Sequence, residues 1–147
     1  VADLQAACDA NGLSLEEATV ANSGGVYQAI KSLVGNVDAV FIPTDNTVVS
    51  AFESLTKVCT ESQTPLYAAD VDSVPRGAIA AMAQDYYQHG RQTGAMAERI
   101  LTQGAKPGEM PVEFLHDVEL HLNMQSAAAM GVTIPEDIKA SADSVIE

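Results

Sequence analysis

The chain of 147 residues carries 20 acidic and seven basic side chains, a formal net charge of −13. This charge repels nucleic-acid phosphates and anionic lipid headgroups, so it argues against nucleic acid or a membrane surface as a partner. Hydrophobic residues make up 47% of the sequence, which argues against disorder and suits one domain with a substantial core.

Residues 1–36 contain two predicted helices and one predicted strand. Apolar side chains recur at helical spacing over 1–11, and the pattern starts at Val1 without a capping residue, as though the helix had been cut into. Apolar residues then alternate over 13–20, which predicts a strand. A second apolar stripe predicts a helix over 26–34 that Gly35 ends.

The next segment holds two apolar runs, 37–42 and 65–69, each followed by carboxylates. Such short runs bounded by turn formers predict strands buried on both faces, as in a parallel sheet covered by helices. A helix predicted over 47–60 joins them into a right-handed βαβ unit. Ligands of open parallel sheets bind beyond the carboxyl ends of the strands, so we expect the polar residues there to face one cleft. These residues are Thr44, Asp45, Asn46, Asp70, Asp72 and Ser73.

The rest of the chain continues the alternation of strands and helices. A short strand is predicted over 78–83, and the longest helix, over 86–101, has a face of small and apolar residues that implies close approach to another element. Two short strands near 111–114 and 118–122 and two short helices over 125–130 and 135–144 follow. The predicted fold class is α/β, with a doubly wound, mainly parallel sheet flanked by helices.

The cysteines and histidines give no sign of a metal or a catalytic centre. Cys8 and Cys59 lie in different predicted helices, so they pair only if those helices pack side by side, and otherwise they are two free, buried thiols. The three histidines lack ligand spacing. No apolar stretch approaches the ~20 residues of a membrane span. We therefore expect no cofactor, no metal and no chemistry at this site.

Each candidate residue also has a structural interpretation. Asp45 can accept a hydrogen bond from the ammonium of a zwitterionic ligand, or it can cap the following helix. Asn46 is the better-placed cap, which would leave Asp45 free to face the cleft. Asp70 can contact a ligand or be a buried acid held by the amides of residues 71–73. Thr44, Asp72 and Ser73 can contact the ligand or serve local caps and turns.

Five ordered segments together resemble one known family. They are Ala18–Ser23, Val37–Asn46, Ala69–Ala78, Asp85–Gly94 and Gly131–Glu136. In this order they are similar to ABC-transporter substrate-binding proteins of the type I periplasmic-binding fold, in the branch that carries amino acids, aromatic ones among them. The resemblance covers nearly the whole chain.

The resemblance implies two lobes that close around an amino-acid-like ligand and present it to a membrane permease, in the periplasm or as a cell-surface lipoprotein. Residues 1–83 and 112–147 then form the second lobe without its first strand, while residues 84–111 belong to the first lobe. Gln84 falls at the expected hinge, where it can bind the ligand or solvate the hinge. We also expect the chain to need its missing first lobe, or a second chain, to complete the sheet.

Two other functions remain open from the residues alone. A receiver-like phosphoacceptor or phosphohydrolase would use an aspartate at a strand end, Asp45 or Asp70, with further acids to hold magnesium, but no lysine follows a predicted strand end. The effector domain of a transcription regulator shares the type I fold, but it would need a basic DNA-binding headpiece that matches the charge of −13 poorly.

Overall fold

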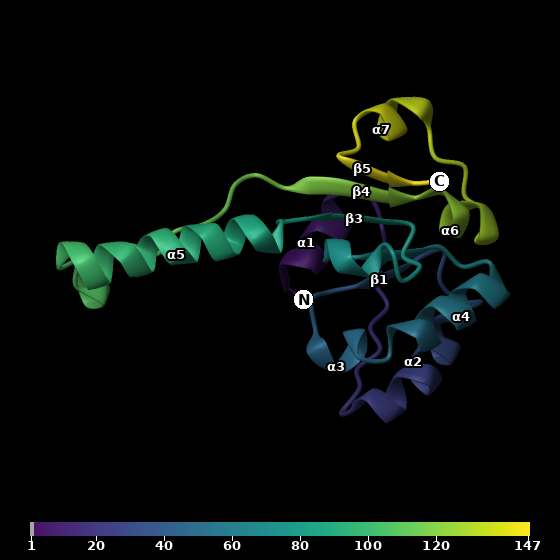
Figure 1. Ribbon diagram of the computed structural model, residues 1–147. Coiled ribbons are helices and arrows are strands. Elements are labelled where there is room, and N and C mark those ends of the chain that lie inside the picture. Colours follow the sequence, from purple (N-terminus) through teal and green to yellow (C-terminus); the bar gives the residue numbers. More distant parts are fainter. Residues whose placement is uncertain (1) are drawn as a thin grey trace.

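The computed structural model describes residues 2–147 and shows a mixed α/β fold (Figure 1). Its five-stranded sheet is built in the order β1-β2-β3-β4-β5, with helices flanking it. The strands are β1 (Val40–Ile42), β2 (Leu66–Ala68), β3 (Ala80–Ala83), β4 (Glu119–Asn123) and β5 (Ser144–Ile146). Neighbours pair in parallel except β3 and β4, which are antiparallel. The predicted fold class is therefore confirmed.

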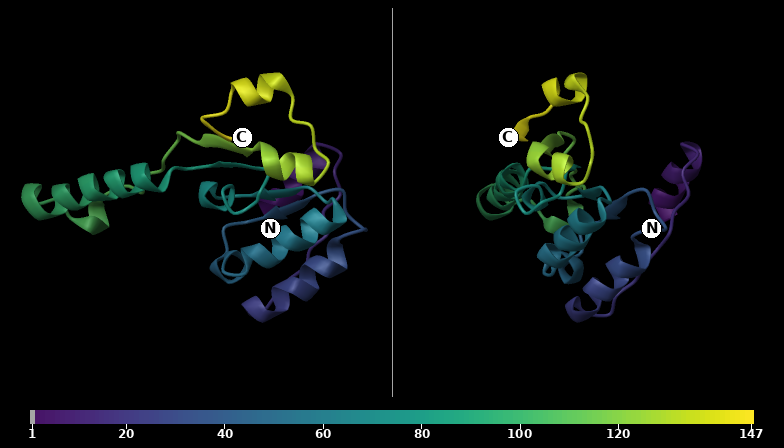
Figure 2. Two further views of the ribbon diagram at one scale, coloured as in Figure 1. Left: turned by 45° about the vertical axis from the view of Figure 1, so that its right-hand side comes forward. Right: turned by 90° about the vertical axis from the view of Figure 1, so that its right-hand side faces the viewer.

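Seven α-helices occupy the described part of the chain. They are α1 (Ala2–Ala10), α2 (Val26–Leu33), α3 (Asn46–Val49), α4 (Phe52–Ser62), α5 (Tyr86–Gln103), α6 (Met124–Ala129) and α7 (Glu136–Ala140). Short 3-10 turns cover Ser23–Gly25, Val71–Ser73 and Pro107–Glu109. Helices α2 and α4 lie side by side under the sheet, whereas α5 extends beyond it as an arm (Figures 1 and 2).

One hydrophobic core lies between the strands and helices α2, α4 and α6. Its largest fully buried side chains include Phe52, Ile30, Leu66, Ile79 and Met130. The opposite face of the sheet is open at β1 and β3, where Phe41 is 46% exposed and Met82 is 64% exposed. The expectation that the first two strands are buried on both faces is therefore wrong for β1, whose alternate residues Val40 and Ile42 alone are buried.

The arm leaves the sheet after β3 and returns to it at β4. None of the residues 86–103 of α5 is buried, although the helix carries the face of small and apolar side chains. An ion pair between Arg99 and Glu113 holds the returning segment against the helix. At the base of the arm, Gln84 Nε2 donates to the Leu115 carbonyl at 2.7 Å and joins the outgoing and returning segments.

Several local predictions were wrong, and each error has a physical cause. Residues 13–20 form neither strand nor helix, because an alternating segment becomes a strand only where a partner strand pairs with it. No strand forms at 111–114 for the same reason. The last residues form β5 instead of ending a helix, because Ser144–Ile146 pair with β4. The expectation about Val1 lies outside the described residues.

The helix expected over 47–60 is interrupted between α3 and α4. Ala51 has φ −114° and ψ 25°, outside the helical range. The carbonyl of Val49, at the end of α3, instead accepts a hydrogen bond from the Arg76 side chain at 2.9 Å. A contact with a residue 27 positions later is invisible to helical periodicity, which explains the missed break.

Candidate functional site

The polar residues after β1, β2 and β3 lie along one edge of the sheet. These three strands are parallel neighbours, so their carboxyl ends meet at the same edge. The loop after β1, residues 43–51, and the loop after β2, residues 69–77, also touch directly, because Thr44 Oγ1 donates to the Ala69 carbonyl at 3.3 Å. Gln84 follows β3 at this edge. The sequence analysis therefore placed its candidate residues in adjacent loops.

Asp45 is the N-cap of α3. Its backbone is extended at φ −135°, and its Oδ1 accepts the amide hydrogen of Val48 at 3.1 Å. The expectation that Asn46 provides this cap is wrong, since Asn46 is the first residue of the helix itself. Thr44, Asp45 and Asn46 are all exposed. A carboxylate has more acceptor positions than one amide uses, so Asp45 can cap α3 and still receive a donor from solution.

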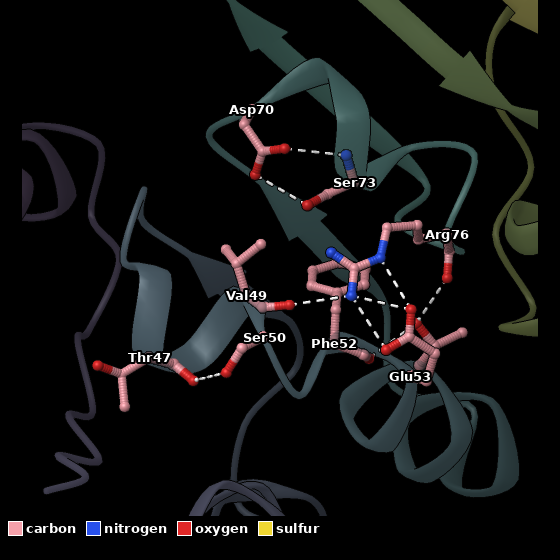
Figure 3. Close-up of polar contacts among 9 residues, drawn as sticks. Thr47, Val49, Ser50, Phe52, Glu53, Asp70, Ser73 and Arg76 are labelled. Carbon is pink, nitrogen blue, oxygen red and sulfur yellow. Dashed lines mark hydrogen bonds and ion pairs between the residues drawn. The ribbon is translucent and has the colours of Figure 1, made fainter. Parts of the chain in front are cut away.

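Asp70 is a buried acid that organises its own loop. It is 6% exposed; Oδ1 accepts the Ser73 amide hydrogen at 2.9 Å and Oδ2 accepts the Ser73 hydroxyl at 2.8 Å (Figure 3). Ser73 is completely buried, so its hydroxyl faces Asp70 instead of solvent. Asp72, in the same 3-10 turn, is exposed. Within this loop the surface carboxylate is Asp72, and Asp70 and Ser73 set the shape of the turn.

Arg76 joins the two loops, a role that the sequence analysis missed. Its Nε donates to Glu53 Oε1 at 2.8 Å, its Nη2 donates to the Val49 carbonyl at 2.9 Å, and the guanidinium lies 5.2 Å from the centre of the Phe52 ring (Figure 3). The hydrogen bond with Arg76 lowers the pKa of the Glu53 carboxyl and raises that of the guanidinium. The only sequence signal was a basic residue in a predicted turn of a strongly acidic chain.

A trough of about 350 Å³ lies beside the site, between residues 15–20, helix α2 and strand β1. Apolar side chains dominate its lining, and Pro43 and Asp45 belong to it as well. The apolar lining includes Leu15, Val20, Val26, Ile30, Leu33 and Phe41. The sequence pattern gave no sign of this trough, because residues 15–20 were expected to form a strand.

The thiols and histidines form no reactive cluster among the described residues. Within residues 2–147, no group of three or more His, Cys, Asp or Glu side chains could hold a metal ion. Both cysteines are free, Cys8 half-buried and Cys59 fully buried. Burial raises the pKa of the Cys59 thiol to about 11, so the thiol stays protonated at neutral pH.

Parallel strands whose carboxyl ends carry polar loops at one edge are the arrangement in which open α/β sheets bind ligands. The sequence model of the ABC transporter substrate binding protein family matches residues 1–146, and the chain belongs to this family. The family consists of solute-binding proteins, which are extracytoplasmic and not enzymes. The phosphoacceptor and regulator hypotheses have no support from this match.

Similar proteins include one curated relative and two solved structures. The chain is 34% identical over 135 residues to the tyrosine-binding protein of Clostridioides difficile strain R20291, covering 92% of this chain and 37% of that protein. A conserved domain protein from Vibrio cholerae is 35% identical with a TM-score of 0.92, covering 98% of this chain and 48% of that one. An ABC domain in complex with L-Trp from Streptococcus pneumoniae is 29% identical with a TM-score of 0.91, and the match covers 99% of this chain and 50% of that one.

The chain thus spans half or less of the length of these relatives. Among the described helices, none combines the length and the hydropathy needed to cross a lipid bilayer.

Proposed function

We propose that this chain is part of the extracytoplasmic solute-binding component of an ABC importer and that its small-molecule ligand is an amino acid with an aromatic side chain. The observation that carries this proposal is the edge where the loops after two parallel strands meet and expose Asp45 and Asp72. Two similar proteins support the ligand class, since one is named for binding tyrosine and another was solved with L-Trp.

Each exposed group at this edge has a role in the proposal. The free acceptor positions of the Asp45 carboxylate receive the ligand ammonium, a charge-assisted hydrogen bond. Thr44, Asn46 and Asp72 complete the polar contacts, Asp70 and Ser73 hold the second loop in shape, and Gln84 holds the base of the arm. The ligand is bound and released without chemistry, and it favours the closed arrangement because only that arrangement touches it from both sides.

The proposed partners are a membrane permease and the remainder of the substrate-binding protein. Residues 84–111 belong in this proposal to a first lobe, which covers the apolar side chains of α5 that the described residues leave exposed. The full protein acts in the periplasm or as a lipoprotein on the cell surface.

The open edge of β1 supports a partner for the sheet as well. Val40 donates to the Pro65 carbonyl at 2.8 Å and Ala69 donates to the Ile42 carbonyl at 2.9 Å, so both β1 residues direct their peptide groups toward β2. In a parallel pair the intervening residue, Phe41, directs its N–H and C=O the other way, toward the edge of the sheet that carries no strand. A further strand, supplied by the rest of the protein, would pair there.

The test is calorimetric titration of the full-length protein with the twenty amino acids, together with two variants. Asp45→Asn keeps an N-cap side chain but loses the charge, and it is expected to weaken binding about 10- to 100-fold, the value of a hydrogen bond to a charged group. Asp38→Asn is the matched control, because Asp38 is an exposed carboxylate before the opposite end of β1. It should leave affinity unchanged.

Two outcomes would contradict the proposal. If no amino acid binds the unmodified protein, the ligand class is wrong. If tyrosine or tryptophan binds equally well to Asp45→Asn and to the unmodified protein, the ligand class stands but Asp45 is not its ammonium acceptor.

A further inference from the structure

We infer that Arg76 is a positioning residue for the proposed ligand site: it holds α3, and with it the exposed residues Asp45 and Asn46, in a fixed place relative to the second loop without touching the ligand. This inference rests on the proposed function. Its starting point is the fork of the Arg76 side chain, which leaves the second loop and binds both sides of the break between α3 and α4 (Figure 3).

Packing holds helix α3 only in part, because Val48 and Val49 lie against the core but stay partly exposed. It has only four residues and none of them is buried, so it gains little from the core. Its amino end is tied by the Asp45 cap, and the Val49 carbonyl at its carboxyl end is bound by Arg76 Nη2 at 2.9 Å. Without the hydrogen bond from Arg76, the carboxyl end of α3 is held less firmly, and the helix can shift together with Asp45 and Asn46.

Arg76 can act as an anchor because its own backbone is fixed. Its amide donates to the Ser73 carbonyl at 3.2 Å, and its carbonyl accepts the Thr56 hydroxyl at 3.0 Å. Thr56 belongs to α4, whose inward side chains are buried in the core. The core therefore reaches the carboxyl end of α3 through the Arg76 side chain, in addition to the packing of Val48 and Val49.

The geometry of the contact requires an arginine. Nη2 serves Glu53 Oε2 at 3.0 Å as well as the Val49 carbonyl, while Nε binds Glu53 Oε1 at 2.8 Å and the planar group lies over the Phe52 ring. A planar guanidinium makes these contacts together, whereas the single ammonium of lysine is a point donor on a flexible stem. Lysine is expected to restore only part of the function.

The experiment compares Arg76→Met, Arg76→Lys and Glu53→Gln in the full-length protein. Glu53→Gln removes the ion pair but leaves the hydrogen bond from Arg76 to Val49, so it serves as the matched control. Loss of the anchor lowers preorganisation, and we expect Arg76→Met to raise the dissociation constant of the bound amino acid about tenfold. The dissociation constant of Arg76→Lys should lie between those of Arg76→Met and the unmodified protein. Glu53→Gln should bind the amino acid as tightly as the unmodified protein, even if its melting temperature is lower.

Amide hydrogen exchange without ligand provides the second readout. The amides of Val49 and Ser50 donate to the Asp45 and Asn46 carbonyls within α3, so Arg76→Met should speed their exchange while Glu53→Gln should not. A purely structural Arg76 would lower the melting temperature and leave both the dissociation constant and these two amides unchanged, which would overturn the inference. If the unmodified protein binds no amino acid, the proposed function fails, and unchanged exchange at Val49 and Ser50 would still refute the positioning role.

Discussion

Replacing Gly77 by alanine is expected to destabilise the loop that carries Asp70. Gly77 is buried and has φ +114°, a conformation that side-chain-bearing residues rarely adopt. A Cβ at this position would lie 2.3 Å from Thr56 Cγ2 and 3.0 Å from Thr56 Oγ1. Thr56 cannot turn away without loss, because its hydroxyl donates to the carbonyls of Arg76 at 3.0 Å and Phe52 at 3.2 Å.

Two separate costs contribute to the expected effect. The left-handed backbone costs about 1–3 kcal/mol for a residue other than glycine. Forcing a methyl group against a packed neighbour costs about 1–3 kcal/mol more. The free energy of unfolding of Gly77→Ala should therefore be lower by about 2–6 kcal/mol, from the sum of these two terms.

A double-mutant cycle in urea separates the two costs. Thr56→Ser deletes the Cγ2 methyl group, the atom nearest to the new Cβ, and keeps a hydroxyl for Arg76 and Phe52. Gly77→Ala should cost about 1–3 kcal/mol less in the Thr56→Ser background than alone, a coupling typical of residues in contact. If Gly77→Ala lowers the free energy of unfolding equally in the unmodified protein and in Thr56→Ser, the steric contact contributes nothing. If it does not lower the free energy of unfolding at all, the argument from the backbone angle φ is refuted as well.

Two further predictions concern the open edge of β1 and the buried thiol. Phe41→Pro removes the amide that points away from β2, and with it a ladder hydrogen bond if a further strand pairs there in the full-length protein. The free energy of unfolding of Phe41→Pro should then be lower than that of Phe41→Ala by about 1 kcal/mol or more, the value of one hydrogen bond; equal losses for the two variants would mean that no strand pairs at this edge. Cys59 should react with iodoacetamide only after denaturation, whereas the half-buried Cys8 reacts in the native protein, as peptide mass spectrometry would show. Because burial raises the pKa of Cys59 from 9.0 to about 11, the unfolded thiol loses its proton first, and stability should fall as pH rises through this window. Cys59→Ala should lack this part of the pH dependence, and an unchanged slope would contradict it.

The sequence predicted correctly the βαβ unit and the meeting of the two polar loops at one edge of the sheet. Apolar runs around Val40 and Leu66, a helical stripe through Leu55 and carboxylates directly after each run are local patterns. They depend on the 2- and 3.6-residue periods of strand and helix, which a chain shows before it folds. The parallel pairing of β1 with β2 then brought the two loops together as expected.

The roles of the acidic residues could not be predicted, because they depend on side-chain directions. Asp45 and Asn46 are adjacent and both are good N-cap residues, and only the backbone at φ −135° makes Asp45 the cap. Likewise, Asp70 and Asp72 lie two positions apart, yet one is buried against Ser73 and the other is exposed.

Composition and periodicity by themselves determined the fold class and the edge of the sheet where the polar loops lie, and the resemblance of the ordered motifs indicated the family. Only the tertiary structure decided that residues 13–20 stay unpaired, that 144–146 form a strand, and that Arg76 reaches Val49. The physical reason is the same in each case: a strand needs a partner and a side-chain hydrogen bond needs an acceptor, and both come from residues distant in the sequence.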